Sequence, residues 1–353
     1  MDLKAQIQRY ELPYIRPATT SRGALQSRTL WILELFYAHK PQVKGRGECG
    51  IIPGLSPEDR PGFENHIHEF TERISGPTPI SPNEWDAFFY NSPALQFAYE
   101  CALLDLKNGG NQILYQTPWI QGSEGIPING LVWMDSYTTM LKQAKEKIAA
   151  GFHCIKIKVG AIDFDQECAL LHEIRKDHKP EQLLLRLDAN GAFSHSDAQD
   201  KLKALKAYHI HSIEQPVAPK QPDLMASLCE QRIIDIALDE ELIGINPQTE
   251  GPQLLHALKP QYIILKPSLI GGFEACNMWI QHAVSSRIGW WATSALESNI
   301  GLNAIAQWVT THNITGHQGL GTGALYTQNF EPHTQIGNGN LYPQSPDFFR
   351  VRP

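Results

Sequence analysis

Polar and hydrophobic residues alternate along two segments near the start of the chain, residues 3–14 and 27–37. Alternation with a period of two is typical of strands with one buried face, so these segments are predicted to form two antiparallel strands. The polar, glycine-containing segment 16–26 between them is predicted to be a flexible loop that could reach a neighbouring site. Two helices are predicted next, over residues 56–74 and over residues 92–107, which begin with Ser92-Pro93.

The pattern changes near residue 126, where apolar runs of strand length begin to alternate with segments of helical periodicity. This alternation is typical of parallel βα units and predicts an α/β fold. We expect a (β/α)8-type barrel over residues 123–327, with an N-terminal α+β capping domain over residues 1–122 that the tail 328–353 rejoins. About eight strands are predicted, at residues 128–134, 154–159, 183–187, 212–214, 233–238, 262–266, 289–293 and 316–319.

Composition agrees with a globular protein of this organisation. Of the 353 residues, 42% are hydrophobic and 19% are charged. The net charge of −7 comes without a long basic run, so nucleic acid is not an expected partner. No stretch approaches the roughly 18 apolar residues that span a bilayer, and the N-terminus lacks an apolar signal core. The six cysteines show no paired short spacing, which favours a reducing cytoplasm.

Three acidic residues, Asp188, Glu214 and Asp239, each end a predicted barrel strand. Successive strands of a parallel barrel deliver their C-terminal residues to one shared mouth, so these carboxylates are expected to converge. Carboxylate oxygens are hard ligands that suit Mg²⁺ or Mn²⁺, and such an ion keeps positions open for a substrate carboxylate. The alternative is that each acid caps the helix after its strand, a frequent role for Asp in βα loops.

Three lysines occupy comparable positions. Lys156 and Lys158 are two residues apart on one strand and therefore share its inward face, and Lys266 ends a strand about half the barrel away. A substrate held at the metal site could lie between Lys158 and Lys266, with each lysine on one side of the same carbon atom. A neighbouring metal ion favours loss of an ammonium proton, as a general base requires. The alternative is that the lysines are ion-pair partners of the buried acids.

The lysine and carboxylate motifs at the strand ends, taken in chain order, resemble those of the muconate-lactonizing-enzyme subgroup of the enolase superfamily, and the resemblance covers nearly the whole chain. The resemblance implies that Asp188, Glu214 and Asp239 bind Mg²⁺ and that a proton α to a carboxylate is removed. It also implies the modified barrel and the capping domain of that superfamily. The matching motifs are Lys-Ile-Lys at 156–158, Asp188-Ala-Asn190, Glu214-Gln-Pro216, Leu238-Asp239-Glu240 and Lys266-Pro267.

Other segments bear on the substrate. Dipeptide epimerases of this superfamily carry Asp-x-Asp on the eighth strand, whereas this chain has the glycine-rich segment 319–323, whose backbone N–H groups suit a second carboxylate. A tight turn that needs glycine only for its backbone is the alternative. Together with segments 19–23 and 294–299, this pattern resembles o-succinylbenzoate synthases. The resemblance assigns substrate binding to Arg22, Arg186, Asn190, Ser294, Gly321 and Thr322.

The implied reaction is the β-elimination of water from a cyclohexadiene carboxylate that bears a succinyl chain. Lys158 would take the α-proton and return it to the departing hydroxide from the same side, Lys266 would stay charged and stabilise the enolate, and Lys156 would be an auxiliary charge. An N-succinylamino acid racemase would use the same two lysines on opposite faces. A different class, a non-catalytic barrel that binds a ligand and keeps the acids as helix caps, is also compatible with single motifs.

Overall fold

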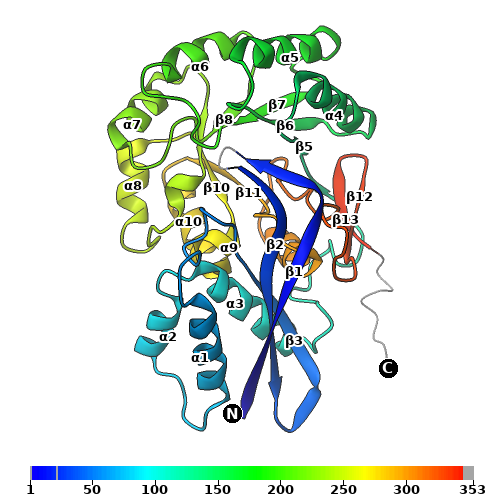
Figure 1. The fold of residues 1–353 in the computed structure, drawn as a ribbon, viewed down its shortest axis with the longest axis vertical. Helices are drawn as coiled ribbons and strands as arrows, with labels where there is room; N and C mark the ends of the chain where they lie inside the picture. The colour runs from blue at the N-terminus through cyan, green and yellow to red at the C-terminus, as the bar shows by residue number, and fades with distance from the viewer. Residues whose placement is uncertain (1, 21–22, 345–353) are drawn as a thin grey trace.

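The N-terminal part of the chain folds as an α+β domain in a computed structural model that describes residues 2–20 and 23–344. Its strands form one antiparallel sheet in the order β1-β2-β3, and α3 packs on β3. The long hairpin of β1 and β2 runs from the capping helices to the barrel (Figure 1). The elements are β1 (Leu3–Thr20), β2 (Gly23–Tyr37), β3 (Lys40–Gly50), α1 (Phe63–Ser75), α2 (Pro82–Phe89) and α3 (Pro93–Lys107).

The predicted loop over residues 16–26 is wrong wherever the structure describes it. Strand β1 continues to Thr20 and β2 starts at Gly23, with Ala18 opposite Leu25. A break in the register between Pro13 and Ala18 accompanies the change in composition. Residues 16, 17, 23, 24 and 26 are exposed, and backbone pairing does not require apolar side chains, so a solvated strand extension has the composition of a loop.

A parallel sheet of seven strands, in the order β11-β10-β9-β8-β7-β6-β5, forms most of the barrel. The ring is completed by residues 318 and 319, because Gln318 bridges Ile128 and Gly319 bridges Thr293, both in parallel. The predicted eighth strand is therefore present as isolated bridges. The strands are β5 (Gly130–Val132), β6 (Cys154–Lys158), β7 (Leu184–Asp188), β8 (Ser212–Glu214), β9 (Ile236–Leu238), β10 (Tyr262–Leu265) and β11 (Gly289–Ala292).

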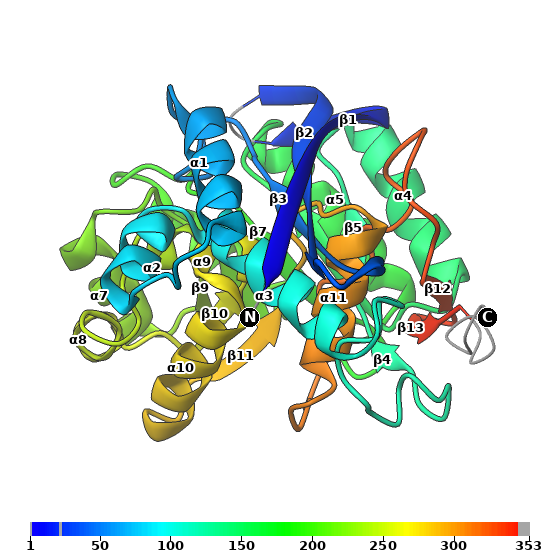
Figure 2. The same cartoon turned by 90° about the horizontal axis from the view of Figure 1, so that it is seen from below.

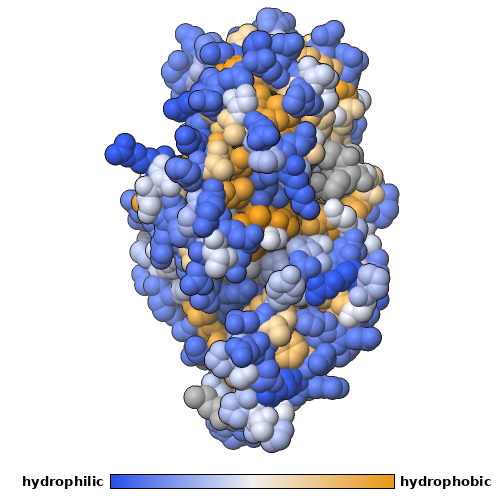
Figure 3. Space-filling model, turned by 90° about the vertical axis from the view of Figure 1, so that its left-hand side faces the viewer, coloured by the Kyte–Doolittle hydropathy of each residue, from blue (hydrophilic) through white to orange (hydrophobic). Residues whose placement is uncertain are grey.

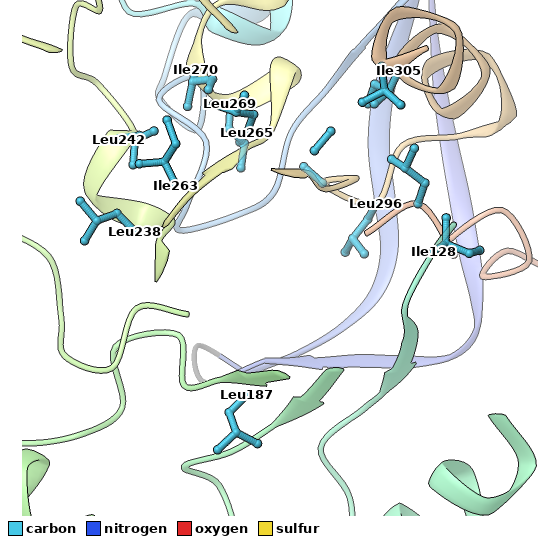
Figure 4. Packing of buried hydrophobic residues seen from close by; sticks show 14 of the residues in the cluster. Ile128, Leu187, Leu238, Leu242, Ile263, Leu265, Leu269, Ile270, Leu296 and Ile305 are labelled. Atoms are coloured by element: carbon cyan, nitrogen blue, oxygen red, sulfur yellow. The ribbon is translucent and has the colours of Figure 1, made fainter. Parts of the chain in front are cut away.

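Helices cover the outside of the barrel, which confirms the predicted fold class (Figure 1). Within β6, Ile155 and Ile157 face the helices and belong to the main hydrophobic core, whereas Lys156 and Lys158 alternate with them on the inner face. Figure 4 shows part of this core, with Leu187 on β7 and Leu265 on β10. The helices are α4 (Tyr137–Ala149), α5 (Phe164–Asp177), α6 (Ala198–Lys206), α7 (Pro222–Gln231), the 3-10 helix η1 (Glu240–Leu242), α8 (Gly251–Leu258), α9 (Pro267–Ile270), α10 (Gly272–Ser285) and α11 (Asn299–Val309).

The C-terminal tail, as far as residue 344, contacts both parts of the molecule. The hairpin of β12 (Thr334–Gly337) and β13 (Asn340–Pro343) pairs with β4 (Ile126–Pro127) and lies beside it in Figure 2. Upstream of this hairpin, Tyr326 stacks on Tyr14 of β1 with a ring separation of 4.8 Å. The division of the chain after residues 122 and 327 stays a prediction.

The face drawn in Figure 3 is mostly hydrophilic, with apolar residues gathered mainly toward its middle. Among the helices that the structure describes, none has the length and apolar character needed to cross a membrane.

Candidate functional site

Charged side chains from successive strands meet at the C-terminal rim of the barrel. Lys158 lies opposite Asp188 in the register of β6 and β7, and Asp188 lies opposite Glu214 in the register of β7 and β8, so the three residues stand at one level. Asp239 directly follows β9, and Lys266 directly follows β10. The structure therefore brings the five residues that the sequence singled out at strand ends to one rim.

These charges are buried and paired with one another. Lys156 Nζ lies 2.7 Å from Glu214 Oε2 and 3.1 Å from Asp188 Oδ2, and Lys158 Nζ lies 3.0 Å from the same Asp188 oxygen. Lys266 Nζ contacts Asp239 Oδ2. The ion pairs that the sequence left as an alternative are thus present, and buried acids need such partners.

The surroundings shift the ionisation of these groups in opposite directions. Burial by itself raises the pKa of the Asp188 carboxyl, but Lys158 and Lys156 outweigh burial and hold that pKa well below its ordinary value. Burial raises the pKa of Glu214, and Lys156 only partly offsets burial and the repulsion from Asp188 and Asp239. Glu214 is therefore less fully compensated by the lysines than Asp188 is.

A second layer of polar side chains orients the rim. Asn190 accepts a hydrogen bond from Lys158 Nζ at 2.6 Å and donates one to Glu240 at 3.0 Å. Gln215 accepts from the backbone N–H of Asp239 at 3.2 Å and donates to Glu241 at 2.9 Å. Glu241 is buried and accepts this bond. A polar residue directly after a predicted metal ligand, such as Gln215 after Glu214, is the sequence feature that could have indicated this second layer.

A cavity opens beside the charges, and the predicted residues Asn190, Ser294, Gly321 and Thr322 line it together with Lys156, Lys158 and Lys266. The Thr322 hydroxyl donates to Ser294 Oγ at 2.7 Å. The apolar part of the lining includes Ile52 and Leu55 of the N-terminal domain and Leu131 of β5. Ile52 and Leu55 have no chemical signature in the sequence, and only the docking of the two domains reveals them.

Of the predicted substrate residues, Arg186 lies away from the cavity, and the prediction for Arg22 is not tested. Arg186 lies inside the barrel but not in the cavity lining, because its guanidinium stacks 3.7 Å from the Trp291 ring centre and donates to the His317 carbonyl at 2.8 Å. Arg22 lies outside the residues that the structure describes.

A larger cavity, of about 640 Å³, opens at the other end of the barrel, where Tyr262 and Gly289 begin β10 and β11. Barrel enzymes carry out their chemistry at the C-terminal face, and the convergent carboxylates and lysines lie there. We therefore place the functional site at the rim and not in the larger cavity.

The donor set at the rim fits a hard divalent cation. Asp188, Glu214 and Asp239 offer only oxygen atoms, which suit Mg²⁺ or Mn²⁺. Glu214 Oε1 is buried without a hydrogen-bond partner, so it has a free coordination position. In the part of the chain that the structure describes, no three His, Cys, Asp or Glu side chains are already arranged around a metal position. Lysine ammonium groups instead lie on the carboxylate oxygens.

Comparison with known proteins places these features in context. Residues 139–346 match the family described as enolase C-terminal domain-like. The o-succinylbenzoate synthase of Desulfotalea psychrophila is 44% identical over 93% of this chain and 95% of its own length. The crystal structure of MenC from the same organism superimposes with a TM-score of 0.86 and 39% identity, covering 97% of this chain and all of that one.

A more distant structure bears on the fold alone. The dipeptide epimerase of Enterococcus faecalis, in complex with Mg and the dipeptide L-Leu-L-Tyr, is 23% identical with a TM-score of 0.79, covering 98% of each chain. The two-domain arrangement thus persists at low sequence identity.

Proposed function

The chain belongs to the enolase superfamily, in its muconate-lactonizing-enzyme subgroup, and on that premise we propose how its rim of charges carries out the o-succinylbenzoate synthase reaction. The synthase activity follows from 44% identity over 93% of the chain to such an enzyme. It makes the protein a dehydratase of menaquinone biosynthesis, and the alternative of a non-catalytic, ligand-binding barrel is therefore rejected. The substrate is 2-succinyl-6-hydroxy-2,4-cyclohexadiene-1-carboxylate, a small carboxylate. A cytoplasmic location stays a prediction.

Asp188, Glu214 and Asp239 would hold the divalent cation, Mg²⁺ with Mn²⁺ as a substitute. When bound, this ion offsets the negative charge that builds up on the substrate carboxylate as its α-proton leaves. The support in this chain is the buried Glu214 Oε1, which has no hydrogen-bond partner, and the convergence of three carboxylates at one rim.

Lys158 acts as the base and then as the acid. In its neutral form it removes the proton from the ring carbon beside the carboxylate, and the electron pair left behind forms the new ring double bond as the C–O bond breaks. The departing hydroxide takes the same proton back from Lys158 and leaves as water, which requires both groups on one face of the ring. Asn190, which accepts from Lys158 Nζ, holds the ammonium in place between the two transfers.

Lys266 acts from the other side of the barrel as a fixed cation. Four steps of strand order separate β10 from β6, so Lys266 and Lys158 face the cavity from opposite walls. Burial lowers the pKa of Lys266, but the carboxylates of Asp239, Glu240 and Asp188 together outweigh burial and hold that pKa above its ordinary value, which favours the ammonium form. It stabilises the negative charge on the ring, and Lys156 keeps Asp188 and Glu214 in position.

Ser294, Gly321 and Thr322 form the polar side of the cavity and are suited to the succinyl carboxylate. Ile52, Leu55 and Leu131 provide the apolar side, which suits the ring. Arg186 has no place in this proposal, since it is engaged with Trp291 away from the cavity.

The observation that carries the proposal is the pair Lys158 and Lys266 facing one cavity beside three buried carboxylates. The test is turnover of the succinyl-hydroxy-cyclohexadiene carboxylate, followed by loss of the diene absorbance, with Mg²⁺, with EDTA, and with Lys158→Ala. Lys142→Ala is the matched control, because Lys142 is an exposed lysine on α4. We expect Mg²⁺-dependent turnover that Lys158→Ala abolishes and Lys142→Ala leaves unchanged.

Racemisation of N-succinylamino acids is the second candidate, because two lysines on opposite walls could exchange one proton from either face. Absence of diene turnover in a folded, Mg²⁺-loaded protein that racemises N-succinylamino acids would overturn the synthase proposal.

A further inference from the structure

One wall of the substrate cavity is a short segment after β11, residues 294–298. Ser294, Ala295 and Leu296 of this segment line the cavity. Leu296 has a φ of 65°, a left-handed conformation that residues with a branched side chain rarely adopt. A strained backbone of this kind persists only where its surroundings over-determine it. Contacts from outside the segment must therefore hold residues 294–298 in this conformation.

Two buried residues of the N-terminal domain reach this wall. Arg28 of β2 donates from Nη1 to the carbonyl of Ala295. Glu48 of β3 accepts from the backbone N–H of Ser298 at 3.0 Å and from that of Gly301, in the first turn of α11, at 3.1 Å. Both are about 1% exposed. The wall is therefore held from one side at Ala295 and from the other at Ser298.

The packing around these contacts leaves little freedom. A side chain at Gly50 would bring its Cβ to 2.8 Å from Arg28 Nε, and one at Gly301 would bring its Cβ to 2.9 Å from Glu48 Oε2. Both positions thus need the space that glycine provides. Buried, charge-assisted hydrogen bonds in such a setting fix geometry more firmly than neutral ones.

The wall is also tied to the catalytic strands. Glu297 accepts hydrogen bonds from the hydroxyls of Ser294 and Ser268, and Ser268 lies two residues after Lys266. The hydroxyl of Tyr326 donates to the carbonyl of Leu296. A displacement of the wall would therefore reach the polar side of the cavity through Ser294 and Thr322.

We infer that Arg28 and Glu48 are positioning residues, which fix residues 294–298 as the substrate-binding wall of the cavity. The inference rests on the proposed function, because it assigns the wall to the succinyl-bearing substrate. Neither residue lines the cavity, and Lys156, Lys158 and Lys266 lie on β6 and directly after β10, outside residues 294–298. Loss of either residue is thus expected to weaken substrate binding more than it slows the chemical step.

The experiment compares Arg28→Met and Glu48→Gln with Glu100→Gln as matched control. Glu100 of α3 also spans the two domains, because it accepts from the N–H groups of Phe273 and Glu274 at the start of α10, but it is not part of the cavity lining. For each variant, kcat and KM are measured at pH 8, with the Kd for the product o-succinylbenzoate and the Tm as a check of folding.

For Arg28→Met and Glu48→Gln we expect KM and the product Kd to rise about tenfold, the size expected from one lost charge-assisted hydrogen bond, with kcat within about threefold of wild type. Glu100→Gln should leave KM within about twofold. Arg28→Lys, which keeps a cation that can reach Ala295, should recover part of the loss, and it replaces Arg28→Met if that variant does not fold.

Unchanged KM and Kd in the Arg28 and Glu48 variants, or an equal rise in Glu100→Gln, would overturn the inference. A fall in kcat alone would do the same, because it indicates a loss of active protein. A wild-type protein without diene turnover would instead refute the proposed function, so the two failures are distinguishable.

Discussion

Glu100 offers a quantitative test of the contact between the two domains. Its carboxylate accepts hydrogen bonds from the first N–H groups of α10, an arrangement that favours the charged form. Burial nevertheless dominates and, with a contribution from Glu274, raises the pKa of Glu100 from 4.5 to about 7. We predict that Glu100→Gln changes how the stability of the protein depends on pH.

The sign follows from proton binding in the folded and unfolded states. Between pH 4.5 and about 7 the folded protein keeps a proton on Glu100 that the unfolded chain has lost, so stability falls as pH rises through this window. The two pKa values differ by an amount worth about 3 kcal/mol at most. Glutamine cannot ionise, so the variant escapes this loss. It gives up about 1 kcal/mol at every pH, because one acceptor oxygen is missing.

The assay is urea denaturation of wild type and Glu100→Gln between pH 4.5 and 8, at constant salt. The free energy of unfolding of the variant relative to wild type should rise with pH by about 3 kcal/mol. Glu58 and Asp105 also have pKa values raised by burial, to about 7 and about 6, so the wild-type curve alone contains several groups. Only the difference between the two proteins isolates Glu100. A difference that stays constant with pH would refute the reasoning.

Two further predictions concern the barrel interior. Adding Mg²⁺ should raise the Tm of the wild type, and Glu214→Gln should abolish this rise, because it neutralises the carboxylate with the unpartnered oxygen; a rise of equal size in the variant would contradict the metal assignment. Arg186→Met should lower the free energy of unfolding in urea by about 1–2 kcal/mol through loss of the cation–π contact with Trp291, while KM stays within about twofold; a large rise in KM would return Arg186 to the substrate site.

The rim was predictable because its signal is local. A charge at the end of an apolar run marks a strand terminus, and a period of two places Lys156 and Lys158 on one face, so Asp188 and Glu214 could be placed without knowledge of the helices. The same period also placed Arg186 inside the barrel. The period does not show how far below the rim a side chain lies. Arg186 precedes Asp188 by two residues, which corresponds to about 6.6 Å along the strand, so it lies below the rim.

What depends on the approach of distant segments was not predictable. Ile52 and Leu55 follow β3 and reach the cavity only because the N-terminal domain docks over the barrel mouth. The sequence does not show which distant residues an apolar side chain will contact. The extension of β1 to Thr20 was missed for a related reason, since exposed strands and loops share a polar composition.

The way Glu48 and Glu100 sit on barrel helices has a consequence for protein engineering. Each carboxylate of the N-terminal domain satisfies backbone N–H groups that begin α11 or α10, so the barrel cut free of that domain would expose two helix ends together with the apolar residues around them. A barrel fragment is therefore a poor starting scaffold. A chimera that exchanges N-terminal domains between relatives therefore needs an incoming domain with a glutamate at the position of Glu48. It also needs a barrel that keeps Ser298 and Gly301 opposite that glutamate, so that the wall of the substrate cavity keeps its shape.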